Sequence, residues 1–493
     1  MRQLQILAQE LRFFSLAQVF EICYLRPTMA ELINTFLTEV SDFVWGPPMA
    51  LILLSAGLIL TVRTVLIQVR GFAHGIGIAT GKYDDPSHKG QLTHFQALSA
   101  ALSATIGIGN IAGVAIAIYW GGPGAIFWMW VTAFFGMALK YAECTLAVKY
   151  RRIDPDGNVR GGPMYFIEHG MPKYFKPLAW MFGICTAIAA FGAGNMVQSN
   201  TMAHSIIDAF EVSPANETTV RWIIGFVTAG LVGMVIIGGI KRIGKVASYL
   251  VPVMSVVYVV SALIILVINF EQVIPAFNLI FYHAFNPTAV VGGAAGGATV
   301  WMTFTWGLRR GMFSNEAGQG SAAMAHSAAK VDEPVREGLV AMLGPFIDTI
   351  VICTMTALVI ISTGIWSSGD TGAVLTMNAF DQGLPIYGRW MVVVGIMLFA
   401  FSTVIAWSYY GEKGIEYIGG TAAKLPYKWV YILFTLLGAR FDLQAVWAFA
   451  DTANGLMAIP NLIGLIALSG VVVKISKKYM TEREQGLHKP FKK

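Results

Sequence analysis

The chain has 493 residues, of which 56% are hydrophobic and only 13% are charged, with a net charge of +6. A soluble domain carries about 25% charged residues, so this composition excludes a soluble globular protein. The excess Lys and Arg residues are spread over alternate connections and the tail, which argues against a nucleic-acid-binding surface. Since a helix needs roughly 20 apolar residues to cross a bilayer, the length allows about ten to twelve membrane spans and no soluble domain.

The N-terminal segment precedes the first apolar run. Residues 1–28 are weakly amphipathic and lack the layout of a signal peptide. Met29 opens a better-formed start, so we expect the natural chain to begin there. In the numbering of the full sequence, residues 1–46 are expected to be an extension outside the membrane, and an extra span is expected at 47–68.

Eleven apolar runs are long enough to be spans, and the tenth is interrupted by Arg440 and Asp442. We expect a first five-helix repeat at 95–269, a second at 288–473, and a basic tail at 474–493. The predicted spans are 47–68, 95–119, 123–149, 177–209, 221–240, 246–269, 288–326 (broken), 337–364, 389–411, 428–446 and 448–473.

The Lys and Arg residues predict the orientation of these spans. They gather in the connections that follow the first, third, fifth, seventh and ninth spans, and in the tail, whereas the other connections hold few. Cytoplasmic connections carry the excess of positive charge. The tail is therefore expected in the cytoplasm and the N-terminus outside.

Two of the predicted spans are interrupted. The second contains Gly107, Gly109 and Gly113, and the seventh contains Gly307 beside Arg309 and other polar residues. Close helix packing through Gly-x-x-x-Gly spacing is one explanation of such glycines. However, each interrupted span opens a set of five spans with opposite starting orientation, and paired broken helices at matching positions are typical of secondary transporters.

The chemistry of a broken helix suits an amino acid. The N-terminus of a half-helix presents free N–H groups and the positive end of a dipole, which favour a carboxylate. Unwound carbonyl oxygens suit an ammonium group or a hard cation such as sodium. The sequence therefore predicts a midplane site for a small zwitterion.

Several motifs resemble those of the alanine or glycine:cation symporters, in the amino acid-polyamine-organocation superfamily. The resemblance covers about residues 35–475 and is most specific at Ser314-Asn315-Glu316-Ala317-Gly318. It implies an all-α membrane protein with a leucine-transporter-type (LeuT) 5+5 inverted repeat and one extra N-terminal transmembrane helix, in a bacterial cytoplasmic (inner) membrane. The other motifs that carry it are residues 107–115, 121–125, 310–313, 401–403 and 407–412.

The resemblance also implies the cargo and the residues that bind it. The expected activity is symport of alanine or glycine driven by sodium, by alternating access. Ile108 departs from the small polar residue expected between the two glycines, which leaves side-chain selectivity open. The expected substrate-binding residues are Thr105, Gly107, Gly109, Gln198, Thr303, Thr305, Gly307 and Trp407.

A sodium site is expected between the first broken helix and the ninth span. The resemblance places the hydroxyls of Ser402 and Thr403 beside the carbonyls of Ser103 and Ile106, and it assigns Asn110 to a second sodium site. The alternative is that the two hydroxyls bond carbonyls of their own helix, which is common for Ser and Thr. Sodium is the expected coupling ion, with protons as the alternative, and no other cofactor is expected.

Ionisable residues inside spans are costly and commonly functional. Arg310 and Glu316 are six residues apart, too far for a helix pair, so their partners are expected on other helices. One interpretation is a cytoplasmic-side charge network that breaks and re-forms during transport, and the other is static pairing that specifies packing. The remaining in-span charges are Glu143, Arg309, Asp348 and Glu412.

Two other classes of function compete with a transporter. A channel would favour identical elements around a pore, and the chain has no repeated filter motif. A membrane enzyme would need a cluster of nucleophile, base or metal ligands, and the eight His residues lie mainly in loops or singly. The sequence therefore favours a non-enzymatic symporter whose partners are a small neutral amino acid, sodium and the lipid bilayer, with no nucleic acid. The oligomeric state stays open.

Overall fold

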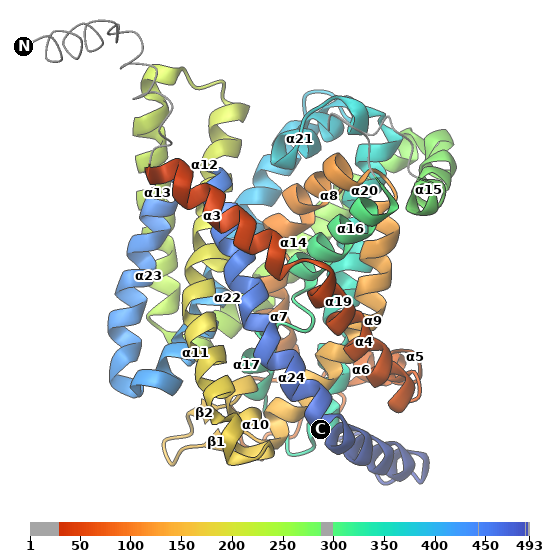
Figure 1. The fold of residues 1–493 in the computed structure, drawn as a ribbon, viewed down its shortest axis with the longest axis vertical. Helices are drawn as coiled ribbons and strands as arrows, with labels where there is room; N and C mark the ends of the chain where they lie inside the picture. The colour runs from red at the N-terminus through yellow and green to blue at the C-terminus, as the bar shows by residue number, and fades with distance from the viewer. Residues whose placement is uncertain (1–28, 287–298, 442, 489, 492–493) are drawn as a thin grey trace, which may run out of the picture.

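The computed structural model describes residues 29–286, 299–441, 443–488 and 490–491 (Figure 1). Helices dominate these residues, and the strands β1 (Arg152–Ile153) and β2 (Val159–Arg160) form a short antiparallel hairpin. Within the described ranges, eight helices are long and apolar enough to cross a membrane, and a bent pair makes a ninth. The molecule is therefore a bundle of membrane-spanning helices.

The helices follow the apolar runs of the sequence. In chain order they are α3 (Met29–Val44), α4 (Pro47–Arg63), α5 (Ile67–Arg70), α6 (Phe72–Ala79), α7 (His94–Thr105), α8 (Val114–Gly121), α9 (Ala125–Lys149), α10 (Pro163–Gly170), α11 (Lys176–Phe191), α12 (Val197–Ala209), α13 (Pro214–Ile236), α14 (Gly239–Ile268), α15 (Phe270–Phe285), α16 (Val300–Asn315), α17 (Ala322–Ser327), α18 (Pro334–Ala341), α19 (Leu343–Pro345), α20 (Thr354–Ser362), α21 (Gly372–Gly383), α22 (Gly388–Gly419), α23 (Lys424–Gly438) and α24 (Leu443–Glu484).

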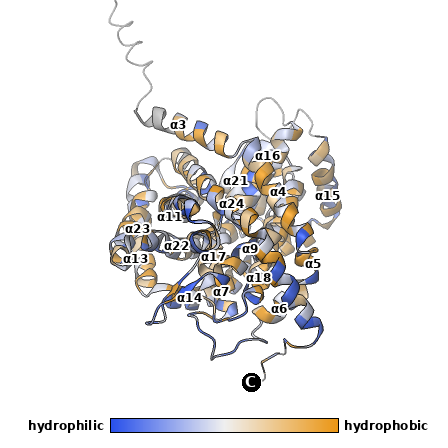
Figure 2. Ribbon diagram, turned by 60° about the horizontal axis from the view of Figure 1, so that its bottom comes forward, coloured by the Kyte–Doolittle hydropathy of each residue, from blue (hydrophilic) through white to orange (hydrophobic). Residues whose placement is uncertain are grey.

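The peripheral helices expose large hydrophobic side chains. Val253, Val256 and Val267 of α14 and Phe281 of α15 are exposed, and Figure 2 shows hydrophobic residues along α15 and α23 on the outer flanks. In water such faces would be unstable, but lipid tails are as apolar as these side chains. This exposure agrees with a bilayer around the bundle.

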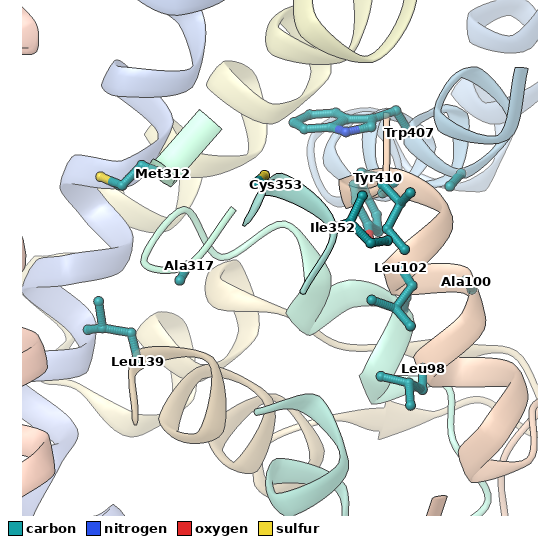
Figure 3. Packing of buried hydrophobic residues seen from close by; sticks show 14 of the residues in the cluster. Leu98, Ala100, Leu102, Leu139, Met312, Ala317, Ile352, Cys353, Trp407 and Tyr410 are labelled. Carbon is teal, nitrogen blue, oxygen red and sulfur yellow. The ribbon is translucent and has the colours of Figure 1, made fainter. Parts of the chain in front are cut away.

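The core lies where α7 and α22 cross. Trp407 and Tyr410 of α22 are buried against Leu102 of α7, and Figure 3 shows them beside Ile352. The central helices bury nearly all their side chains, including polar ones. Polar groups are tolerated at this depth only when they are bonded within the protein or line a cavity.

Regular α-helix is replaced by π-helical turns around this core. The described residues contain three, namely η1 (Gly109–Gly113), η3 (Gly192–Met196) and η4 (Phe346–Cys353). η1 contacts η4, and η3 contacts α22. π-helical turns occur frequently at functional sites, because they shift the register of side chains and free backbone groups.

The helix boundaries differ from the predicted spans at both ends of the chain. Residues 35–46, predicted as an extension, belong to a span-length helix pair that runs from Thr35 to Arg63, while residues 1–28 lie outside the described residues. At the other end α24 continues to Glu484, so the first part of the predicted tail is helical. Apolar residues stop before the charged ends, but helix hydrogen bonding does not depend on side-chain polarity.

Two of the predicted spans correspond to helices too short to count as complete crossings. The seventh corresponds to α16 and α17, and its residues 288–298 lie outside the described ranges. The tenth corresponds to α23, which ends at Gly438, just before the Arg440 and Asp442 that interrupt its apolar run. The total of eleven spans and the inverted relation of the two five-helix sets stay predictions.

Candidate functional site

The first break lies at the end of α7. This helix begins at a capping box formed by Thr93 and Gln96 and ends at Thr105, where Ile106 adopts an extended conformation with ψ of 92°. The chain resumes as η1 and α8, bent by 53° from α7. The last carbonyls of α7 and the first N–H groups after the break have no intrahelical partner, and side chains bond several of them: Gly107 N donates to Asn110 Oδ1 and Ile108 N donates to Gln198 Oε1.

A small pocket lies beside this break. It encloses about 10 Å³, which is near the minimum that holds one water molecule. An amino acid would need the surrounding helices to move apart. The residues that line the pocket are Ala104, Thr105, Gly107, Gly109, Ala193, Gln198, Phe313, Glu316, Thr403, Trp407 and Asn454. We call it the central pocket.

Glycine is required at two places around the central pocket. A Cβ at Gly107 would collide with Thr403 Oγ1 and lie 3.3 Å from Gln198 Oε1. A Cβ at Gly194 would collide with the ring of Trp407. Both glycines therefore let α22 approach the main chain of the neighbouring helices closely.

Gln198 bonds the main chain at the first break. Its Oε1 accepts a hydrogen bond from Ile108 N at 3.3 Å, and its Nε2 donates to Ala193 O at 2.8 Å. The amide thus links the break in the second predicted span to the π-helical turn of the fourth. Of the predicted substrate residues, Thr105, Gly107, Gly109, Gln198 and Trp407 line the central pocket.

The second break does not lie where the sequence placed it. The prediction of an interruption at Thr303, Thr305 and Gly307 is wrong, because α16 is continuous from Val300 to Asn315. Thr303 Oγ1 donates to Gly121 O at 2.8 Å, Thr305 Oγ1 donates to Trp301 O, and Gly307 packs against Ala125. None of the three residues lines the central pocket.

The interruption occurs at Glu316, which ends α16 in the left-handed conformation with φ of 55°. Gly318 and Gly320 follow with positive φ, and α17 then begins at Ala322. Polar residues inside α16 do not break it, because their side chains find partners on other helices. A left-handed backbone does break it, since that conformation is incompatible with a continuing helix.

The oxygen atoms predicted for sodium lie together. Ser402 Oγ is 3.2 Å from Ser103 O and 3.4 Å from Ile106 O, and Thr403 Oγ1 is 3.4 Å from Ile106 O. Both hydroxyls also donate within their own helix to Phe399 O, at 2.8 and 3.0 Å. The cluster therefore combines the negative dipole end of α7 with two hydroxyl oxygens, which are hard ligands that suit an alkali cation.

Asn110 links the two breaks. Its Oδ1 accepts from Gly107 N at 2.8 Å, and its Nδ2 donates to Asp348 Oδ1 at 2.7 Å. Asp348 Oδ2 accepts from Ser314 Oγ and Thr349 Oγ1, both at 2.7 Å. The sequence marked Asp348 only as a charge inside a span, and its position between the breaks depends on how η4 packs against η1.

Glu316 and Arg310 lie in different surroundings, and each finds its partner on another helix. Glu316 Oε1 accepts from Trp407 Nε1 at 2.7 Å, and its Oε2 accepts from Ser321 Oγ at 2.5 Å. Arg310 Nη2 is 2.8 Å from Asp451 Oδ2 of α24. The structure therefore does not join Glu316 and Arg310 in one network.

Some pocket residues were not identified from the sequence. Ala104, Ala193 and Asn454 carry no motif that distinguishes them from packing residues, and only the arrangement of α7, η3 and α24 brings them together. Phe313 lies in the motif at residues 310–313, directly before the most specific stretch, so that motif was the available signal. Trp407 was predicted to bind the substrate, and the structure adds a hydrogen bond from its indole to Glu316.

Comparison with known proteins shows similarity over nearly the whole chain. Residues 29–493 match the model of the family described as "Sodium:alanine symporter family". The sodium/alanine symporter AgcS of Methanococcus maripaludis is 49% identical over 455 residues, which are 91% of this chain and 97% of that protein. An uncharacterized transporter of Haemophilus influenzae is 44% identical over 450 residues, 91% of this chain and 96% of the relative.

A solved structure has a similar fold. The crystal structure of MhsT in complex with L-phenylalanine superposes with a TM-score of 0.57, covering 78% of this chain and 90% of that one. The sequences are 14% identical, so the likeness concerns the fold alone.

Proposed function

Because the chain belongs to the sodium:alanine symporter family, we propose that it carries alanine or glycine across the membrane together with sodium, by alternating access. The family and the fold are those of transporters and not of enzymes. The observation that carries the proposal is the central pocket, where a helix break meets a buried indole and a cluster of oxygen atoms.

The substrate is proposed to bind by its charged ends. The N–H groups after the break at Ile106 would exchange their side-chain acceptors, Asn110 and Gln198, for the carboxylate. The side chains of Gln198 and Glu316 offer acceptor oxygens to the ammonium group. Trp407 and Phe313 are buried beside the pocket, and the helices must move apart to admit any substrate, so the substrate is proposed to be small. These features favour alanine or glycine over larger amino acids.

Sodium is proposed to bind between Ser402, Thr403 and the carbonyls of Ser103 and Ile106, with Asn110 at a second site. An ion there would lie at the end of α7 and would hold α22 against it. Since Thr403 also lines the central pocket, the ion and the substrate would stabilise the same closed arrangement. This shared stabilisation is the basis of coupling, because each ligand favours the state that the other binds.

Packed side chains lie toward both ends of the bundle from the central pocket, and alternating access would require each layer to open in turn. On one side Arg310 lies over the rings of Phe313 and Trp447, with distances of 5.6 and 4.9 Å to their centroids. On the other side His94, at the start of α7, is bonded to the buried Glu337, which also accepts from His326 at 2.6 Å. Under the predicted orientation, the Arg310 side faces outward and the His94 side faces the cytoplasm.

Uptake into proteoliposomes tests the proposal. Labelled alanine and glycine should accumulate when a sodium gradient is imposed, with saturation and with competition between the two substrates. A potassium gradient of equal size is the control for sodium, and a proton gradient tests the alternative coupling ion. Absence of uptake of either substrate, or flux that does not saturate, would overturn the proposal.

A further inference from the structure

A pocket separate from the central pocket lies between the end of α4, the short helix α5 and the last part of α24. It encloses about 330 Å³, within the range of about 300–1,000 Å³ that is usual for small-molecule sites. Figure 1 shows these three helices together at the lower right of the bundle, and α4 packs against α24. We call this space the α4–α24 pocket.

The α4–α24 pocket lies where two apolar runs end. α4 ends at Arg63, and the apolar part of α24 ends at Lys474, beyond which the helix carries several charged residues. Between α4 and α5 the chain turns at Val65 and Leu66, both in the left-handed conformation, and their side chains are 58% and 47% exposed. Long cationic side chains at the ends of spans extend to the level of the lipid head groups. The pocket therefore lies at this level, with apolar side chains facing the hydrocarbon beside it.

Positive charge exceeds negative charge in the wall of the pocket. Arg63, Arg70 and Lys477 line it, and Glu484 is the one carboxylate among the described residues that do so. Under the predicted orientation, the ends of α4 and α24 face the cytoplasm. Basic pockets between spans on that side are typical sites for anionic lipid head groups.

These cationic groups are only weakly engaged within the protein. Arg70 Nη2 lies 3.5 Å from Glu484 Oε1, and the two side chains are 45% and 68% exposed, so this ion pair contributes little to stability. Within the described part of the chain, Lys477 makes no hydrogen bond or ion pair. Arg63 Nη1 donates to Ser469 Oγ at 2.6 Å, which holds the guanidinium against α24 and leaves its other N–H groups for a ligand. A phosphate can therefore bind here without breaking a strong internal contact.

We propose that the α4–α24 pocket binds the head group of an anionic phospholipid. The guanidinium groups of Arg63 and Arg70 bond the phosphodiester, since the planar guanidinium matches the geometry of phosphate oxygens. The ammonium group of Lys477 adds to the attraction, and the acyl chains lie along the exposed Val65 and Leu66. The excess of positive charge disfavours the cationic head groups of zwitterionic lipids. This inference goes beyond the proposed function, because it concerns the bilayer and neither the amino acid nor sodium.

Native mass spectrometry of the full chain tests the inference, after release from phosphatidylcholine nanodiscs that contain an increasing share of phosphatidylglycerol. The wild-type protein should retain one phosphatidylglycerol per chain in preference to phosphatidylcholine. Arg70→Gln with Lys477→Gln should raise the share needed for half-occupancy by about thirtyfold, the effect of two cationic residues near an anionic surface. Lys241→Gln with Lys245→Gln is the matched control, since it removes two exposed lysines of α14 outside the pocket and should retain the lipid like the wild type.

A second variant should bind the lipid more tightly, which loss of folding cannot explain. Glu484→Gln removes the carboxylate from the wall and releases Arg70, so the share for half-occupancy should fall by about fivefold. Glycerol 3-phosphate carries the phosphate without acyl chains and should not displace the lipid at millimolar concentration. Displacement by it, no preference for phosphatidylglycerol in the wild type, an equal loss in the lysine control, or unchanged binding in Glu484→Gln would each overturn the inference. Because binding is measured without alanine or sodium, its outcome is independent of the proposed function.

Discussion

The two helix breaks of this bundle offer different chemistry. At Ile106 to Ile108 the helix ends next to a glycine, and the polar groups at the break are main-chain carbonyls and N–H groups. At Glu316 to Gly320 the helix ends at a glutamate whose backbone is in the left-handed conformation, and the polar groups at the break are side chains. A site built from main chain depends on the space that glycine leaves, whereas a site built from side chains depends on charge and hydrogen bonding.

A hydrogen-bond network around Asn110 and Asp348 connects the two helix breaks. Asn110 accepts from Gly107 N at the first break, and Asp348 accepts from Ser314 Oγ, two residues before the second break at Glu316. Hydrogen bonds through two side chains thus connect the two breaks. This arrangement suits a transporter in which both broken helices move together.

The largest effect is expected from Gly107→Ala at the first break. The added methyl group collides with Thr403, and overpacking of this kind costs about 1–3 kcal/mol, so sodium-driven alanine uptake should fall by about 100-fold. Uptake into proteoliposomes measures the loss, and gel filtration with thermal unfolding checks that the variant is folded. Uptake at the wild-type rate would mean that the close approach of α22 to the break is dispensable.

Glu316→Gln tests the side-chain character of the second break. The amide keeps the shape but cannot accept from Trp407 and Ser321 at the same time, and bonds to charged groups contribute about 1.5–3 kcal/mol each, so maximal uptake should fall by about tenfold. Glu271→Gln, at an exposed glutamate in the first turn of α15, is the matched control. If Glu316→Gln transports normally, the acid has a packing role only.

Ser402→Ala combined with Thr403→Ala tests the oxygen cluster at the end of α7. Removal of two hydroxyl oxygens should raise the sodium concentration for half-maximal uptake by about tenfold, corresponding to about 1.4 kcal/mol. The alanine KM at saturating sodium should change less. Ser408→Ala is the control, because that buried hydroxyl donates to Ile405 O of its own helix at 2.7 Å. An unchanged sodium dependence would assign the ion to another place.

Gln198→Ala should produce the opposite pattern. Loss of its bond to Ile108 N loosens the main chain that is proposed to hold the carboxylate, and one hydrogen bond contributes about 1 kcal/mol, so the alanine KM should rise by about fivefold. Sodium dependence should stay close to that of the wild type. Equal loss of both parameters here and in the double hydroxyl variant would leave the division between substrate and ion sites unsupported.

The smallest effect is expected from Gly113→Ala. The nearest atom to the added methyl group, Arg310 Cδ, lies 4.0 Å away, so uptake should change by less than about twofold, as for substitutions that disturb no packing. The same uptake assay at low alanine concentration measures it. A loss as large as that of Gly107→Ala would show that the whole π-helical turn, and not only the break, needs glycine.

The sequence predicted the first break well and the second poorly, for a physical reason. Gly107 and Gly109 lie directly beside the first break, which their presence in the sequence predicted, because glycine favours the conformations that end a helix. For the second break, the sequence suggested an interruption of the helix at Gly307, Arg309 and Arg310. The helix α16 nevertheless continues through these residues, because Asp451 neutralises the two arginines. No local pattern shows which helix will provide that carboxylate.

Taken alone, the sequence determined the membrane-spanning helical class, the first break, and most residues of the central pocket. Each of these follows from properties carried along one stretch of chain: apolar length, glycine content and a specific motif. Only the tertiary structure decided the place of the second break, the bond between Glu316 and Trp407, and the pairing of Arg309 with Asp42 and Asp451 on two other helices. These features arise between residues far apart in the chain, where packing and the cost of burying an unpaired charge decide the partners.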